Sequence, residues 1–162
     1  MESNETLKEI CRSAELRLDA QLKLATNADQ RLLTLSGINA TLAAAALAAG
    51  AAFAQQNAAD LVVNGFLIYA AIQLVATIIS VMGAAAKAIH PPGVDPMVWD
   101  KLDQEPTRLE MYNSILDVYL EAHKWNREAQ NSRRTAGIYS ILFLTTSTIF
   151  LFCIILYWIL VS

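Results

Sequence analysis

Three long stretches without a charged residue dominate the hydrophobic pattern of this chain. They cover residues 32–59, 61–86 and 135–162, and each exceeds the roughly 20 apolar residues that a helix needs to cross a bilayer. The last stretch follows Arg133 and Arg134 directly and consists mainly of large apolar side chains. A soluble chain of 162 residues has no core large enough to bury such helices. The pattern therefore predicts an all-α membrane protein with three transmembrane helices.

The amino-terminal segment has a narrow apolar seam that is typical of a helix. Its seam positions follow spacings of three and four residues, with Gln21 in the one polar gap. Charged residues occupy the other faces. We interpret residues 1–31 as a cytoplasmic amphipathic helix, and both an ordinary amphipathic helix and a coiled-coil contact with another subunit fit the pattern. The seam residues are Leu7, Cys11, Ala14, Leu18, Ala25, Ala28 and Leu32.

Residues 32–86 are predicted to form a transmembrane helical hairpin whose tip lies near residues 55–60. Small side chains recur every four residues in the first span, which lets a neighbouring helix approach closely. In the second span, a small and polar stripe follows spacings of four and three. The first stripe is Ala40, Ala44, Ala48 and Ala52, and the second is Gln73, Thr77, Ser80 and Ala84.

Several polar residues lie inside these two spans, where each must find a partner or water. They are candidates either for contacts between helices or for the lining of a pore. The second stripe is more typical of a helix contact than of a conduit. The candidate residues are Asn39, Thr41, Asn64, Gln73, Thr77 and Ser80.

The central segment, residues 87–134, is predicted to be a cytoplasmic loop followed by a helix. Three prolines and a glycine within His90–Trp99 exclude a continuing helix there. From about Thr107 an apolar side resumes and meets no breaker before the membrane. We therefore expect one helix from about Thr107 to about Val161, with residues 135–162 as its transmembrane part.

The distribution of basic residues predicts the orientation of the chain. All twelve Lys and Arg residues lie at or before Arg31 or between Lys87 and Arg134. Cytoplasmic segments of membrane proteins are enriched in Lys and Arg. The amino terminus and the central segment are therefore expected in the cytoplasm, with the hairpin tip and the carboxyl terminus outside.

Composition and spacing argue against an enzyme. The net charge of −3 offers no basic surface for a nucleic acid polymer. Cys11 and Cys153 are far apart, as are His90 and His123, and no nucleophile stands beside a base. We expect neither a catalytic site nor a metal or other cofactor.

Polar and basic residues gather where the second cytoplasmic helix reaches the membrane. Arg127, Arg133 and Arg134 can contact lipid headgroups or donate to an anionic ligand, and both readings stay open. The cytoplasmic layer made by residues 5–31 and 106–134 can also dock a soluble partner or set an oligomeric state. Asn126, Gln130 and Asn131 belong to the same polar group.

Three segments carry a resemblance to a known group of proteins. They are ADQRLLTLSGINATLAAAALAAGAA, HPPGVDPMVW and YLEAHKWNREAQNSRRTAGIYSILFL. In layout and motifs the chain resembles small bacterial anti-phage transmembrane effectors of the Pycsar and SLATT type. This resemblance implies a protein that senses an infection signal, often a cyclic nucleotide, assembles in the inner membrane and disrupts it. By position it implicates Asp29, Gln30, Tyr119, Asn126 and Asn131.

We therefore expect a homo-oligomeric, multi-pass protein of the bacterial inner membrane that permeabilises the bilayer when its cytoplasmic helices are triggered. The alternative is a non-conducting scaffold or regulatory subunit that recruits a soluble defence protein through residues 5–31 and 106–134. The two differ in outcome, because a scaffold binds a partner and is not toxic alone.

Overall fold

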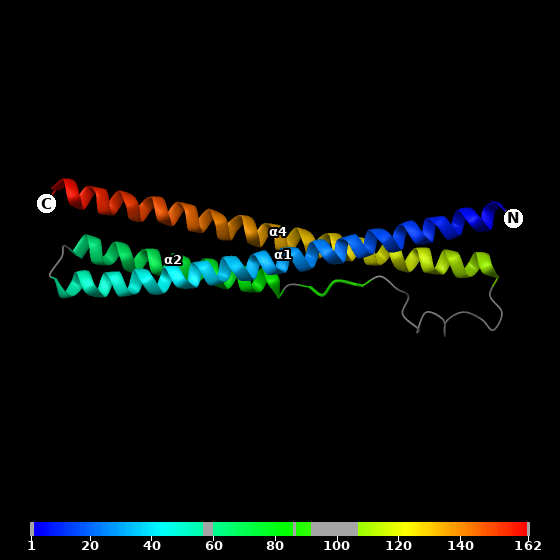
Figure 1. The fold of residues 1–162 in the computed structure, drawn as a ribbon, viewed down its shortest axis with the longest axis horizontal. Coiled ribbons are helices and arrows are strands. Elements are labelled where there is room, and N and C mark those ends of the chain that lie inside the picture. Colours follow the sequence, from blue (N-terminus) through cyan, green and yellow to red (C-terminus); the bar gives the residue numbers. More distant parts are fainter. Residues whose placement is uncertain (1, 57–59, 86, 92–106, 162) are drawn as a thin grey trace. The chain divides into compact units, whose positions relative to one another are not determined.

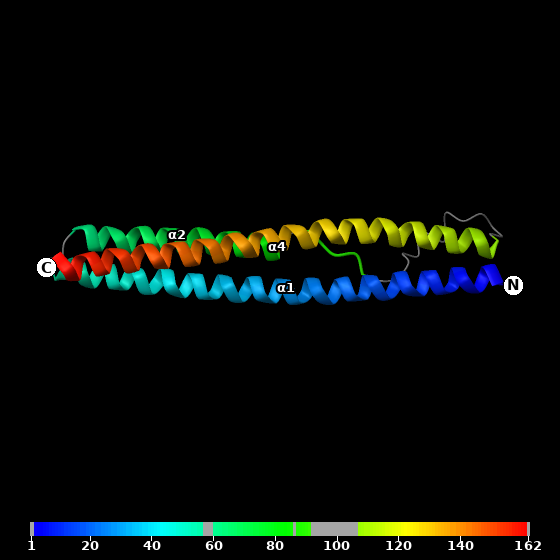
Figure 2. The same cartoon turned by 90° about the horizontal axis from the view of Figure 1, so that it is seen from above.

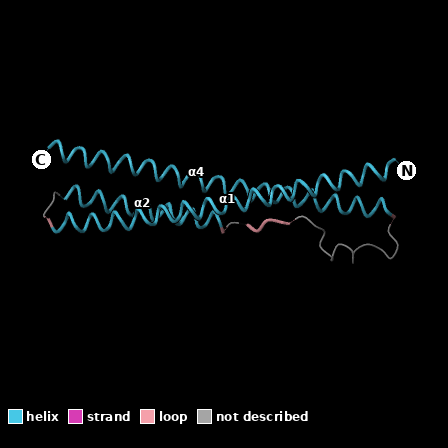
Figure 3. The backbone as a smooth tube through the Cα atoms, in the orientation of Figure 1, coloured by secondary structure: helices cyan, strands magenta, loops and turns pink. Residues whose placement is uncertain are grey.

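The structure is a computed structural model that describes residues 2–56, 60–85, 87–91 and 107–161. These residues form three α-helices, labelled in Figure 1 as α1 (Glu2–Gln55), α2 (Asp60–Ala84) and α4 (Arg108–Val161). No strand occurs in the described part of the chain, so the predicted all-α fold is confirmed. Figure 3 colours the described turns and loops pink, including residues 88–91.

All three helices are long and apolar enough to cross a membrane. The described residues thus contain the predicted number of candidate transmembrane helices. Residues 57–59 of the predicted hairpin tip and most of the proline-rich loop after His90 lie outside the described residues.

A capping box fixes the start of α4. The backbone N–H of Glu110 donates to the Thr107 hydroxyl at 3.3 Å, and the backbone N–H of Thr107 donates to the Glu110 carboxylate at 2.8 Å. This reciprocal pair satisfies backbone donors that a helix start leaves without partners. The hydrogen bonds from Thr107 also hold the pKa of the Glu110 carboxyl below its ordinary value.

The chain divides into two compact units. We call Met1–Asn27 with Lys87–Asn131 the coil unit, and Ala28–Ala86 with Ser132–Ser162 the bundle unit. Helices α1 and α4 contribute to both units, whereas α2 belongs to the bundle unit alone.

In the bundle unit, α1 and α4 run parallel and α2 runs antiparallel to both. Residue numbers rise together in the pairs Asp29–Arg133 and Asn39–Ser140, whereas they change in opposite directions in the pairs Ser80–Ser140 and Gln73–Ser147. Figures 1 and 2 show α2 lying alongside the second part of α1 and of α4. Each span therefore packs against both of the others.

Small residues allow these helices to approach closely. A Cβ built on Gly83 would lie 2.4 Å from the Ala136 Cβ, and one on Gly65 would lie 2.9 Å from Ile154 Cδ1. In α1, the small residues that face the other helices are Ala43, Ala46 and Gly50, all of them buried. The predicted alanine stripe is exposed instead, so within one chain that contact face was assigned wrongly. The exposed stripe is Ala40, Ala44, Ala48 and Ala52.

The coil unit is a parallel pair of helices from α1 and α4. Leu18 and Ala25 of the predicted seam are buried here, and the Cys11 thiol lies 3.8 Å from the carbonyl oxygen of Tyr112. Buried residues repeat every seven positions on both helices, a spacing typical of coiled-coil packing. In the coil unit the repeats are Leu18 and Ala25 on α1 and Tyr119 and Asn126 on α4. In the bundle unit the same spacing gives Leu32, Asn39 and Ala46 on α1 and Arg133, Ser140 and Ser147 on α4.

Candidate membrane-embedded polar site

One serine of α4 joins all three helices of the bundle unit. The Ser140 hydroxyl oxygen accepts a hydrogen bond from the Asn39 side-chain amide at 3.0 Å and another from the Ser80 hydroxyl at 2.7 Å. All three side chains are fully buried. Such bonds hold transmembrane helices together because hydrocarbon offers no competing partner. We call Asn39, Ser80 and Ser140 the first polar layer.

A second polar layer lies seven residues further along α4. The Gln73 side-chain amide donates to the Ser147 hydroxyl at 2.7 Å, and that hydroxyl donates to the Phe143 carbonyl at 2.6 Å. The hydroxyl groups of Tyr69 and Thr148 lie 3.5 Å apart. Tyr69 is one helical turn from Gln73, and Thr148 follows Ser147. Seven helical residues separate the two layers by about 10 Å along α4.

Each layer contains one buried oxygen without a partner. Among the described residues, Asn39 Oδ1 and Gln73 Oε1 accept no hydrogen bond, although both side chains are fully buried. An unsatisfied buried acceptor costs roughly 1–3 kcal/mol. The bundle unit therefore contains two buried acceptors that a donor such as water would satisfy.

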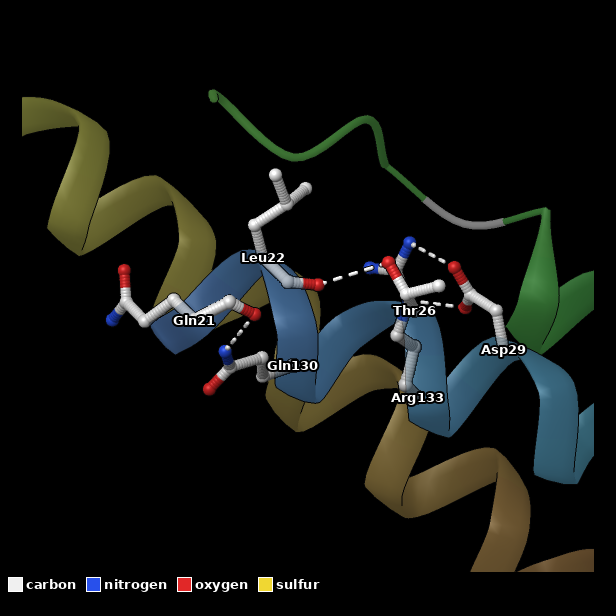
Figure 4. Close-up of polar contacts among 6 residues, drawn as sticks. All are labelled: Gln21, Leu22, Thr26, Asp29, Gln130 and Arg133. Carbon is white, nitrogen blue, oxygen red and sulfur yellow. Dashed lines mark hydrogen bonds and ion pairs between the residues drawn. The ribbon is translucent and has the colours of Figure 1, made fainter. Parts of the chain in front are cut away.

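An ion pair between α1 and α4 lies at the end of the bundle unit that leads to the coil unit. The Arg133 guanidinium donates through Nε to Asp29 Oδ1 at 2.5 Å and through Nη2 to Asp29 Oδ2 at 3.3 Å (Figure 4). The Arg133 side chain is 4% exposed and that of Asp29 is 31% exposed. This two-pronged geometry fixes the guanidinium plane against the carboxylate.

Aromatic rings fill the opposite end, next to the hairpin tip. Phe53 stacks on Phe66 with ring centroids 5.5 Å apart, and it meets the edge of Trp158 at 5.8 Å. We call Phe53, Phe66 and Trp158 the aromatic plug. It packs on an apolar cluster whose buried members are Ala46, Val62, Phe66, Tyr69 and Ala70.

The other predicted pore or contact residues lie outside the two layers. The Thr41 and Thr77 hydroxyls donate to carbonyl oxygens of their own helices, those of Gly37 and Gln73. Thr77 is half-buried, whereas Thr41 and Asn64 are exposed. Two of the six candidates therefore point away from the interior of the bundle unit.

Asn126, a predicted ligand residue, instead binds the chain that leaves α2. Its amide nitrogen donates to the His90 carbonyl at 3.0 Å, and its amide oxygen accepts from the His90 N–H at 2.9 Å. Trp125 Nε1 donates to the Ala88 carbonyl at 3.0 Å, and Lys87 lies over the Trp125 ring. Asn126 is fully buried and bonded at both ends of its amide, so a ligand does not reach it in this arrangement.

The remaining ligand or partner candidates are divided between the two units. Arg133 is paired with Asp29, and Tyr119 is buried in the coil unit. The others are exposed on helix surfaces: Gln30, Arg127, Asn131 and Arg134. The described residues do not place this set in one pocket within either unit.

The coil unit has a groove on either side of the helix pair. One groove, of about 420 Å³, has apolar lining from Ile10, Ala14, Leu116 and Leu120 and polar lining that includes Glu9, Arg17 and His123. The other, of about 630 Å³, is lined mainly by charged residues of α1. Tyr119 lines both grooves.

Burial changes the titration of two groups in the coil unit. Burial raises the pKa of the Cys11 thiol and that of the Tyr119 hydroxyl. The negative charges of the nearby Glu15 and Cys11 raise the pKa of Tyr119 further. A raised pKa means that the folded chain holds the proton more tightly than the unfolded chain. The stabilisation from these two groups is therefore complete at neutral pH and is lost as the pH rises through their folded-state pKa values.

Cys11 is expected to react with iodoacetamide more slowly in the folded chain than in the denatured chain at about pH 8, because the thiolate is the reactive form. The pH at which the reaction reaches half of its maximal rate should also be higher for the folded chain than for the denatured chain. Mass spectrometry of a Cys153→Ser variant measures this rate, with the same variant in denaturant as the control. Identical pH profiles for the two states would contradict the raised pKa.

Sequence reasoning missed Ser140 and Ser147, because the third span was interpreted from its large apolar side chains. The signal was present in their spacing. Together with Arg133 and Asn126 they repeat every seven residues, which places them on one face of a coiled-coil helix. The third span therefore contributes polar groups to both layers.

Comparison of this chain with family models, with curated proteins and with solved structures gives no match.

Proposed function

We propose that the chain is an oligomeric effector of bacterial anti-phage defence that permeabilises the inner membrane when its cytoplasmic helices are triggered. The observation that carries this proposal is the buried polar interior of the bundle unit. Asn39, Ser80, Gln73, Ser140 and Ser147 are enclosed by three apolar spans. Neutral polar side chains ordinarily hold transmembrane helices together. Two of these side chains also carry a buried oxygen without a partner, which helix packing alone does not explain.

The closed bundle has the energetics of a switch. Two unpartnered amide oxygens raise its free energy, and hydration of the layers would satisfy them. A few kcal/mol between two states is enough for a trigger to shift their populations. We interpret the described arrangement as the resting form, in which the polar groups are kept from water.

The exposed face of α1 supports the oligomeric part of the proposal. Between residues 40 and 52 this face is built almost entirely from alanine. Small side chains let transmembrane helices approach closely, whereas large apolar side chains suit lipid better. A second copy of the chain therefore fits this face, and the proposed assembly is a homo-oligomer.

Replacing Ser140 with alanine is expected to shift the chain towards its permeable form without any trigger. Asn39 and Ser80 lose their shared acceptor, and a loss of about 1.4 kcal/mol changes a population tenfold. Collapse of a pH gradient imposed across liposomes, and growth of cells that express the variant, measure the effect. We expect the gradient to collapse roughly tenfold faster than with wild type.

Thr145→Val is the matched control, because the Thr145 hydroxyl is exposed and donates only to carbonyls of its own helix. It should behave as wild type. Tight vesicles containing correctly inserted Ser140→Ala protein, together with unimpaired growth, would contradict the proposal.

One observation favours a non-conducting scaffold as the second candidate. The smaller groove of the coil unit is lined by exposed apolar residues such as Ile10 and Leu120. A soluble defence protein could bind there through an amphipathic helix. Leu120→Glu would then abolish co-purification of the product of a neighbouring gene, and expression of the chain alone would not impair growth.

A further inference from the structure

The polar groups of the bundle unit follow one another along its interior. The series begins at the Asp29–Arg133 pair, continues through the first and second polar layers, and reaches Tyr69 with Thr148. From residue 133 to residue 148, α4 rises by about 22 Å, which is most of a hydrocarbon core of about 30 Å. We call this series the polar file.

The spaces between the layers contain small side chains. Ala76 lies between Gln73 and Ser80 on the buried face of α2, and Ala43 lies between Asn39 and Ala46 on that of α1. Both alanines are buried. They place the least possible side-chain bulk between one polar layer and the next.

The aromatic plug lies beyond Tyr69 and Thr148, towards the hairpin tip. Phe53 contacts both other rings of the plug, and Phe66 is 8% exposed. Apolar constrictions of this kind block permeation by excluding water. The other end of the file is polar, because the Asp29 carboxylate there is partly exposed.

We propose that the interior of each bundle unit takes up a file of water molecules that conducts protons, and that the aromatic plug closes this file. This inference rests on the proposed permeabilising function and names its permeant. It also places the path inside one chain, and not on the surface between copies.

Water is the ligand that the chemistry of the file selects. Both unpartnered groups, Asn39 Oδ1 and Gln73 Oε1, are acceptors and need a donor. A buried water molecule typically bridges two to four polar groups, and the layers supply amide oxygens and hydroxyls. Neutral amides and hydroxyls can pass a proton along bound water, whereas a three-helix interior has no room for a dye.

Phe53→Ala is expected to open the file. In proteoliposomes with a trapped pH-sensitive dye, an imposed pH gradient should collapse roughly tenfold faster than with wild type, because an apolar constriction has been removed. A second, larger trapped dye should be retained. Phe53→Leu keeps much of the apolar volume but loses the ring contacts, so an intermediate rate is expected.

Phe152→Ala is the matched control, since this aromatic residue of α4 is 65% exposed and lies outside the plug. Its proton flux should equal that of wild type. Equal acceleration by Phe152→Ala and Phe53→Ala would overturn the inference, because a general loosening of the bundle would explain both.

Cysteine accessibility tests the path independently of flux. In a Cys11→Ser, Cys153→Ser, Phe53→Ala background, Ser147→Cys should react with silver ions in water, whereas the exposed Thr145→Cys should be protected by lipid. Reaction of Thr145→Cys with protection of Ser147→Cys would place water at the outer surface and overturn the inference.

The two proposals fail in different ways. If Ser140→Ala releases the large dye while Ser147→Cys stays unreactive, permeabilisation stands and the interior path falls. If Ser147→Cys reacts and protons cross, but no trigger or variant impairs growth, the interior path stands and the effector function falls. If the pH gradient across Phe53→Ala proteoliposomes stays intact and Ser147→Cys does not react with silver ions, the interior path is overturned.

Discussion

Replacing Gly83 with alanine is expected to destabilise the bundle unit by about 1–3 kcal/mol, the usual cost of forcing extra volume into a packed interface. The added Cβ would lie 2.4 Å from the Ala136 Cβ and 3.3 Å from Leu32 Cδ1. The first neighbour is attached directly to the backbone of α4, so α2 and α4 would have to separate. Thermal unfolding in detergent, followed by circular dichroism, measures the loss.

Two further variants make this result specific. Gly37→Ala is the matched control, because a Cβ there meets nothing within 4 Å, and a helical Gly→Ala change stabilises by up to about 1 kcal/mol. Combining Gly83→Ala with Ala136→Gly removes the clash and should restore most of the lost stability. Equal unfolding temperatures for Gly83→Ala and Gly37→Ala would refute the close approach of α2 and α4.

Asp29→Asn is the second change with a large expected effect. It removes the carboxylate charge that pairs with the Arg133 guanidinium, which is 4% exposed. Breaking a fully buried pair costs about 3–5 kcal/mol. Because water reaches the Asp29 side, we expect about 2–3 kcal/mol here. The same unfolding experiment measures it.

Asp19→Asn provides the comparison. Asp19 pairs with Lys23 one helical turn away, and the two side chains are 41% and 74% exposed. Exposed pairs of this kind contribute less than about 0.5 kcal/mol. A loss of similar size for Asp29→Asn and Asp19→Asn would show that the Asp29–Arg133 pair is screened by solvent and does not hold the helices together.

The helices could be predicted from the sequence because membrane spans obey a strong and local constraint. Every backbone polar group in lipid must be bonded within the helix, so length and apolar content suffice to identify a span. The start of α4 was predicted at about Thr107 from its apolar positions, and the structure adds a capping box between Thr107 and Glu110 there. These features depend on residues that are neighbours in the chain.

The polar interior was less predictable because it depends on which helix faces meet. The alanine stripe at Ala40 and the face at Ala43 have similar compositions, and local spacing does not say which one faces the neighbouring spans. The pairing of Asn39 with Ser140 joins residues 101 positions apart. Asn126 shows the same limit, because its partner is a backbone segment and leaves no mark in the sequence.

The contact between Asn126 and His90 involves the backbone of His90 and leaves its side chain for another contact. Asn126 binds the N–H and the C=O of residue 90, groups that every amino acid except proline provides together. The backbone of residue 90 is therefore bound by the side chain at position 126, whereas the side chain of residue 90 makes its own ring contact with Trp125. A substitution at position 90 can change that ring contact and keep both hydrogen bonds to Asn126.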